Sequence, residues 1–89
     1  MYKIVQYGSE ACPACGALNV KLNQWLTTHK DVEYTYVNVK EEPAVAAQQG
    51  VFSVPALVVY SDDKELDRRA GYFSLEEFLA RVEELKARA

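Results

Sequence analysis

The chain has 89 residues, of which 49% are apolar and 26% are charged, and its formal net charge is −3. This length suits one small domain, and no Gly-, Pro- or Ser-rich linker divides it, so we expect residues 1–89 to form a single, monomeric domain. The acidic balance argues against nucleic-acid partners, because phosphate binding needs clustered Lys and Arg. No apolar run approaches the about eighteen residues of a membrane span, and the first residues lack a signal-peptide pattern. We therefore expect a cytoplasmic protein with no membrane partner.

In chain order, the first predicted element is a strand at residues 3–7, where β-branched side chains precede a Gly-Ser pair. Pro13 suits the first turn of a helix, because its missing N–H would have no partner there in any residue. An apolar stripe at helical spacing continues this helix to near His29 or Lys30. Residues 33–39 are rich in β-branched and aromatic side chains, which predicts a second strand.

The second half of the chain predicts a helix, a hairpin and a last helix. A short helix is expected at residues 43–50, after two acidic residues that favour a helix N-terminus. Residues 56–60 are nearly all apolar and predict a central strand, with the charged residues 65–70 as its hairpin partner at the sheet edge. Ser74 and Glu77 form a capping box for the last helix. The order β-α-β-α-β-β-α predicts an α/β fold, a four-stranded mixed sheet flanked by three helices.

The motif that carries chemistry is Cys12-Pro13-Ala14-Cys15, between the first strand and the first helix. A helix N-terminus stabilises a thiolate, so Cys12 is predicted to be the nucleophile. Cys15 lies one turn further on the same helix face, within disulfide reach, and is expected to be the more buried, resolving thiol. Attack by Cys12 on a substrate disulfide gives a mixed disulfide, which Cys15 breaks to leave a redox-active Cys12–Cys15 disulfide.

This motif, together with Val54-Pro55 and the order of elements, resembles the thioredoxin and glutaredoxin superfamily, and the length resembles its compact glutaredoxin-like thioredoxins. The resemblance covers nearly the whole chain and implies a thioredoxin fold and a thiol–disulfide oxidoreductase that needs no cofactor or metal. It also implies that the Val54–Pro55 bond is cis and faces the cysteines, and that Gly71 admits substrate backbone from the other side. Besides the cysteines, the predicted active-site and substrate-binding residues are Gln6, Tyr7, Glu10, Pro13, Ala14, Ser53, Val54, Pro55, Gly71 and Tyr72.

The sequence departs from the thioredoxin pattern at two paired positions. Gln6 stands where thioredoxins carry a buried aspartate that helps remove the proton of the resolving cysteine, and Tyr36 replaces the lysine that accompanies it. A glutamine cannot act as this base, but it is a neutral side chain that can be fully hydrogen-bonded. Deprotonation of Cys15 is then left to water, to the leaving thiolate or to Glu10.

The expected partners are disulfide-containing proteins as substrates and a flavin-dependent thioredoxin reductase, or glutathione, as electron donor. A glutathione-dependent glutaredoxin is the alternative: Ser53 keeps a hydroxyl of that pattern, but the cation and carboxylate that bind glutathione are missing. A metal- or cluster-bridged dimer or a non-catalytic interaction domain is the alternative of another class. One chain offers two Cys and His29, fewer than the four ligands of structural zinc, and His29 is better explained as a helix-end residue. Tyr7 lines the active-site loop or is simply a buried strand tyrosine.

Overall fold

The fold is described over residues 1–88 by a computed structural model. The elements in chain order are β1 (Tyr2–Gly8), α1 (Pro13–Leu26), β2 (Val32–Asn38), α2 (Pro43–Gln48), β3 (Ala56–Ser61), β4 (Lys64–Ala70) and α3 (Leu75–Arg88). This confirms the predicted order. No helix in this part of the chain is both long enough and apolar enough to cross a membrane.

The four strands form one mixed sheet in the order β2-β1-β3-β4. β1 runs parallel to β2, with α1 as the crossover between them, and antiparallel to β3, which forms a hairpin with β4. The register pairs Gly8 with Asn38 and Tyr7 with Ala56. The carboxyl ends of β1 and β2 and the start of β3 therefore meet at one end of the sheet, and α1 begins there.

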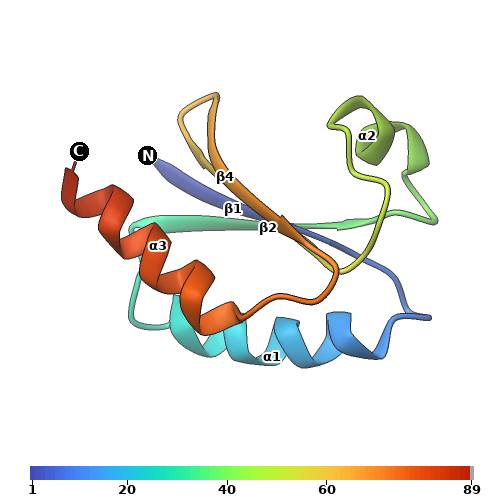
Figure 1. Ribbon diagram of the computed structural model, residues 1–89, viewed down its shortest axis with the longest axis horizontal. Helices are drawn as coiled ribbons and strands as arrows, with labels where there is room; N and C mark the ends of the chain where they lie inside the picture. The colour runs from blue at the N-terminus through green and yellow to red at the C-terminus, as the bar shows by residue number, and fades with distance from the viewer. Residues whose placement is uncertain (89) are drawn as a thin grey trace.

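The helices cover both faces of the sheet, with α1 and α3 on one side and α2 on the other (Figure 1). Residues alternate along β1, so Ile4 packs into the core beneath α1 and α3, while Val5 and Tyr7 pack into the core beneath α2. Leu22 of α1 and Phe78 of α3 are fully buried in the first of these cores. The apolar faces of α1 and α3 thus fix both helices on the sheet.

Helix α1 ends at Leu26, three or four residues before the predicted end. The hydroxyl of Thr27 donates to the carbonyl of Gln24 at 2.6 Å, and that of Thr28 donates to the carbonyl of Trp25 at 3.1 Å. Such local hydrogen bonds compete with the helical ladder, which explains the early end.

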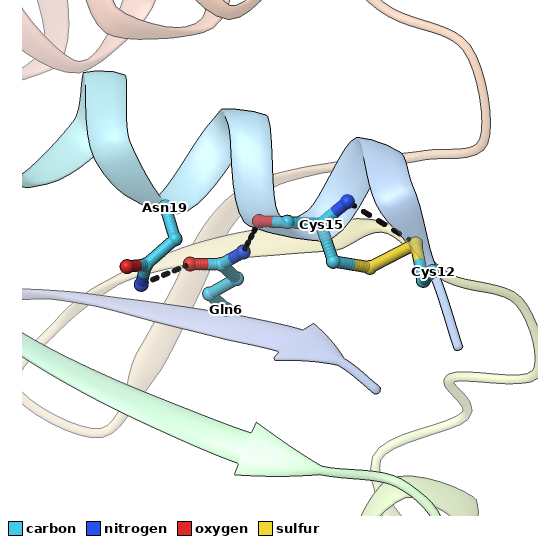
Figure 2. Close-up of a disulfide and its surroundings, with 4 residues drawn as sticks. All are labelled: Gln6, Cys12, Cys15 and Asn19. Atoms are coloured by element: carbon cyan, nitrogen blue, oxygen red, sulfur yellow. Dashed lines mark hydrogen bonds between the residues drawn. A yellow bond between two sulfur atoms is a disulfide. The ribbon is translucent and has the colours of Figure 1, made fainter. Parts of the chain in front are cut away.

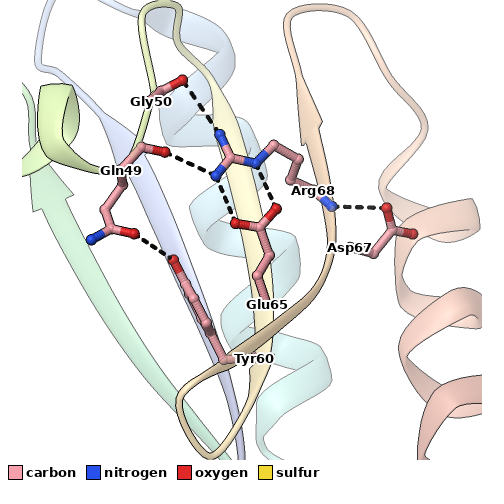
Figure 3. A network of polar contacts seen from close by, with 6 residues as sticks. All are labelled: Gln49, Gly50, Tyr60, Glu65, Asp67 and Arg68. Carbon is pink, nitrogen blue, oxygen red and sulfur yellow. Dashed lines mark hydrogen bonds and ion pairs between the residues drawn. The ribbon is translucent and has the colours of Figure 1, made fainter.

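A polar network on the α2 side ties β4 to the end of α2 (Figure 3). Arg68 donates to the carbonyls of Gln49 at 2.9 Å and Gly50 at 3.4 Å, just beyond the end of α2. Glu65 accepts two hydrogen bonds from the same guanidinium, at 2.8 and 2.7 Å, and Arg68 in turn lowers the pKa of Glu65. A cation at the carboxyl end of a helix is favourable, so this partly exposed pair holds α2 in place.

His29 connects the end of α1 to α3. Its Nδ1 lies 2.8 Å from the carbonyl oxygen of Trp25 and its Nε2 lies 3.0 Å from Oε1 of Glu83. The imidazole also stacks on the indole of Trp25, with ring centroids 3.7 Å apart. The predicted role as a helix-end residue is confirmed.

We predict that His29 stabilises the fold more at low pH than at high pH. The carbonyl of Trp25 and then the carboxylate of Glu83 favour the protonated ring and raise the pKa of His29, although Lys86 opposes them. This stabilisation is complete below about pH 6.5, the usual pKa of an unfolded histidine, and is lost as the pH rises through the folded pKa. In urea denaturation, the free energy of unfolding of the wild type should exceed that of His29→Gln at about pH 5.5, and the difference should shrink by about pH 8.5 as the ring loses its charge. A difference that stays constant over this range would contradict the prediction.

Candidate functional site

Cys12 and Cys15 form a disulfide at the start of α1 (Figure 2). Cys12 is the N-cap residue, with extended backbone angles of φ −111° and ψ 98°, and its Sγ accepts a hydrogen bond from the backbone N–H of Cys15 at 3.2 Å. Pro13 follows in the first turn of the helix. The sulfur of Cys12 therefore occupies the position where N-cap side chains bind unpaired helix N–H groups.

The two sulfurs differ in their access to solvent. Cys12 is half-buried, whereas Cys15 is only 2% exposed, as its place at the start of the apolar stripe predicted. The helix dipole and the N–H of Cys15 both favour negative charge at Cys12. The exposed sulfur is thus also the one whose thiolate the helix stabilises.

A cavity of about 370 Å³ opens beside the disulfide, between the β1–α1 loop, the first turns of α1 and the edge strand β2. The backbone N–H of Cys12 donates to the carbonyl of Ser9 at 3.2 Å, which holds the loop against the helix. The cavity is lined by Ser9, Glu10, Cys12, Cys15, Gly16, Asn19 and Tyr36. Glu10 is the only charged side chain in this lining.

Gln6 joins β1 to the first turn of α1 through a buried network (Figure 2). Its Nε2 donates to the carbonyl of Cys15 at 3.0 Å, and its Oε1 accepts from the hydroxyl of Tyr34 at 2.7 Å and from Nδ2 of Asn19 at 3.3 Å. The same Nδ2 lies 2.6 Å from the Tyr34 hydroxyl oxygen, and burial raises the pKa of Tyr34. Gln6 is fully buried and neutral, and both its oxygen and its amide nitrogen have hydrogen-bond partners, so it holds the cysteine turn instead of acting as a base.

Gly8 lies between the side chains of Tyr36 and Cys15. A Cβ atom at Gly8 would stand 2.9 Å from the hydroxyl oxygen of Tyr36 and 3.0 Å from Sγ of Cys15, closer than real Cβ contacts allow. Glycine is required here because these two side chains approach the backbone of β1 from the same side. Tyr36, which is 39% exposed, thus stands over Cys15.

The Val54–Pro55 peptide bond is cis, as the resemblance implied. Pro55 is buried, and its carbonyl accepts a hydrogen bond from the backbone N–H of Gly71 at 2.9 Å. Gly71 has φ 77°, a conformation that favours glycine. Because β3 starts beside the end of β1, the structure brings Pro55 and Gly71 to the sheet edge that carries the cysteines. Ser53 and Tyr72, on either side of them in sequence, are exposed.

Tyr7 lies away from the cysteines, contrary to its expected place in the active-site loop. It is 2% exposed in the core beneath α2, on the sheet face opposite Gln6. Burial, together with the neighbouring Tyr60, raises the pKa of Tyr7 to about 12. The alternative prediction for Tyr7, a buried strand tyrosine, is confirmed.

Three residues near the cysteines were not predicted from the sequence: Gly8, Asn19 and Tyr34. The signal for two of them was present, since a buried glutamine needs partners for both its oxygen and its amide. Residues at 34 and 36 of β2 lie beside β1, opposite Ile4 and Gln6, but only the strand register shows this.

A helix that begins at a Cys-x-x-Cys disulfide, packed on a mixed sheet beside a cis-proline, defines a thiol–disulfide oxidoreductase. Comparison with known proteins agrees. The thioredoxin family model matches residues 2–84. The thioredoxin of Chlamydia caviae is 34% identical over 68 residues, covering 76% of this chain and 67% of that protein. The thioredoxin of Methanocaldococcus jannaschii is 34% identical over 61 residues, covering 67% of this chain and 72% of that protein.

Solved structures give the same family. The structure of thioredoxin 1 from Thermosipho africanus superposes with a TM-score of 0.87 at 28% identity, covering 96% of this chain and 94% of that one. The chain has the thioredoxin fold and belongs to the thioredoxin family.

We predict that Gln6→Glu makes stability depend on pH. The two side chains have nearly the same shape, but an ionised carboxylate only accepts hydrogen bonds, so the carbonyl of Cys15 loses its donor and a charge is buried. Burial raises the pKa of the new carboxyl above its unfolded value of about 4.3. The variant should therefore match the wild type near about pH 4 and lose at least about 2 kcal/mol of unfolding free energy by about pH 7, measured by urea denaturation.

Gln24→Glu is the matched control for this experiment, because Gln24 is exposed on α1, the helix whose first turn Gln6 contacts. Its unfolding free energy should stay within about 0.5 kcal/mol of the wild type at both pH values. If the unfolding free energies of the two variants changed equally with pH, a carboxylate at position 6 would be no more costly than one on the protein surface, and the prediction would be wrong.

Proposed function

We propose that this protein reduces disulfide bonds in other proteins, with Cys12 as the attacking thiol and Cys15 as the resolving thiol. The observation that carries the proposal is the contrast between the two sulfurs. Cys12 is accessible and sits at the positive end of α1, whereas Cys15 is buried directly behind it. A substrate sulfur can reach the first but not the second, so attack starts at Cys12.

The reaction proceeds by two thiol–disulfide exchanges. The Cys12 thiolate attacks one sulfur of the substrate disulfide, a bond forms between them, and the other substrate sulfur leaves as a thiolate. Cys15 then attacks Sγ of Cys12, forms the Cys12–Cys15 bond and releases the second substrate sulfur. Two electrons pass from the dithiol to the substrate, and the two protons of the cysteines reach the substrate thiolates through water.

Substrate binding is proposed along the loops around the cis-proline. Val54 presents its backbone beside Pro55, and the N–H of Gly71 fixes the second loop against the carbonyl of Pro55. Ser53 and the fully exposed ring of Tyr72 flank this surface. An extended peptide around the substrate cysteine fits these backbone groups, as in other cases where a strand-like segment is bound. Pro13 and Ala14, both exposed, complete the surface on the helix side.

The electron donor is proposed to be a flavin-dependent thioredoxin reductase rather than glutathione. Glutathione has two carboxylates, and a site for it needs cations. The charged side chain that lines the cysteine cavity is Glu10, an anion. We further propose that residues 1–89 work as one monomeric domain in the cytosol, where thiols are kept reduced.

The roles of the two cysteines can be tested by trapping. Cys15→Ser should accumulate a mixed disulfide between Cys12 and a protein substrate, because the resolving sulfur is missing, and mass spectrometry of the non-reduced adduct measures it. Cys12→Ser should form none and should lose reductase activity. Equal trapping in the two variants would overturn the assignment of roles.

The electron donor can be tested by following reduction of insulin disulfides with two donor systems. NADPH with a flavoenzyme thioredoxin reductase should sustain turnover, and reduced glutathione at the same reducing capacity should sustain far less. Faster turnover with glutathione would instead support the glutaredoxin alternative. Inactivity with both donors, together with metal or visible absorbance in the purified protein, would support a metal- or cluster-bridged dimer.

A further inference from the structure

The resolving step needs a thiolate at Cys15, yet Cys15 is buried beside neutral groups. Gln6 holds the carbonyl of Cys15, and its own oxygen is occupied by Tyr34 and Asn19. Neither Gln6 nor Asn19 can take up a proton at neutral pH. Burial without compensation disfavours a thiolate, so the structure must supply some other stabilisation at the sulfur.

The hydroxyl of Tyr36 is the polar side-chain group placed to supply it. This oxygen lies 2.9 Å, and Sγ of Cys15 lies 3.0 Å, from the point that a Cβ atom of Gly8 would occupy, so both atoms border a position that only glycine leaves vacant. Both side chains also line the same cavity beside the disulfide. A side chain larger than hydrogen at Gly8 would stand between the two atoms.

Two side chains with hydroxyl groups line the cavity, Ser9 and Tyr36, and the hydroxyl of Tyr36 lies 2.9 Å from the point above Gly8 that Sγ of Cys15 also borders, which makes Tyr36 the donor. The titratable side chains that line the cavity are Glu10 from the β1–α1 loop, Cys12 and Cys15 from the start of α1, and Tyr36 from β2. Glu10 is an anion that repels a second negative charge, and Tyr34 already donates its proton to Gln6. A tyrosine hydroxyl carries its proton at neutral pH and so donates a hydrogen bond instead of acting as a base.

We propose that Tyr36 donates a hydrogen bond to Sγ of Cys15 in the reduced protein and stabilises the thiolate that resolves the mixed disulfide. The proton of Cys15 leaves to water in the open cavity, and Tyr36 keeps its own. The thiolate then attacks Sγ of Cys12, the Cys12–Cys15 bond forms, and the bond between Cys12 and the substrate breaks. Tyr36 is thus a specific aid to the second exchange, and the inference rests on the proposed roles of the two cysteines.

The test is Tyr36→Phe, which removes only the hydroxyl from a side chain that is 39% exposed on an edge strand and is therefore expected to fold. In a Cys12→Ser background, ultraviolet absorbance of the thiolate as a function of pH gives the midpoint for ionisation of Cys15. Loss of the hydrogen bond should raise this midpoint by about one pH unit, which is about a tenfold loss of thiolate at neutral pH.

Kinetics separate the two exchanges. With both cysteines present, quenched-flow trapping should show the mixed disulfide of Tyr36→Phe decaying about tenfold more slowly at neutral pH, the loss expected from a one-unit shift. Its formation rate should not change, because Tyr36 does not act on Cys12. Tyr60→Phe is the matched control, since its hydroxyl lies near Gln49 beneath α2, and both of its rates should equal those of the wild type.

The outcomes distinguish this inference from the proposed function. A wild type that forms no mixed disulfide at Cys12 would overturn the proposed function itself. A wild type that forms and resolves it, with Tyr36→Phe indistinguishable from Tyr60→Phe, would overturn only the role of Tyr36. Slowing of both exchanges to the same degree would also overturn it, because that result indicates substrate binding in place of thiolate stabilisation.

Discussion

The hydrogen bond from the amide of Gln6 to the carbonyl of Cys15 connects the two parts of the molecule on which chemistry depends. β1 is a central strand, with β2 and β3 on either side, so Gln6 is fixed from both sides. Its amide fixes the first turn of α1, and that turn places both sulfurs at the edge of the sheet. The apolar faces of α1 and α3 hold these helices on the sheet and set which side of each helix faces it, but apolar contacts alone leave the position of α1 along its axis less sharply defined. The buried polar contact defines this position, because an unpaired amide or carbonyl there is costly.

A neutral network in this position has a different character from a buried ion pair. Burying a carboxylate and an ammonium group costs desolvation free energy. Removing one partner then destabilises the fold strongly, because the other charge stays buried without compensation. Here the side chains of Tyr34 and Asn19 donate hydrogen bonds to the side-chain oxygen of Gln6, and none of the three carries a charge. In the described part of the chain, every buried side-chain polar atom has a hydrogen-bond partner. The network therefore keeps its geometry over a range of pH. The proposed pH-dependent chemistry lies instead with the two sulfurs and the hydroxyl of Tyr36.

Local sequence patterns were enough for the element order, the placement of the cysteine pair and the greater burial of Cys15. They were insufficient wherever a long-range contact or a competing local bond decided the outcome. The end of α1 was misplaced because the hydroxyls of Thr27 and Thr28 take helix carbonyls. Of the two expectations for Tyr7, a place in the lining of the active-site loop is wrong, because strict alternation with Gln6 sends the side chain to the opposite face, and a buried strand tyrosine is confirmed. The partners of Gln6 depend on the register between β1 and β2, which a single sequence does not encode in any short pattern.

The central position of β1 also has a consequence for synthesis of the chain. β1 is translated before the other three strands, yet one of its two neighbours in the sheet is β3, which begins only at Ala56. Until that segment has followed, the backbone hydrogen-bonding groups of β1 that face β3 have no native partner, although its side chains can already pack against residues of α1, β2 and α2. An incomplete chain on the ribosome is thus prone to wrong strand pairing. This risk ends when the hairpin of β3 and β4 docks beside β1.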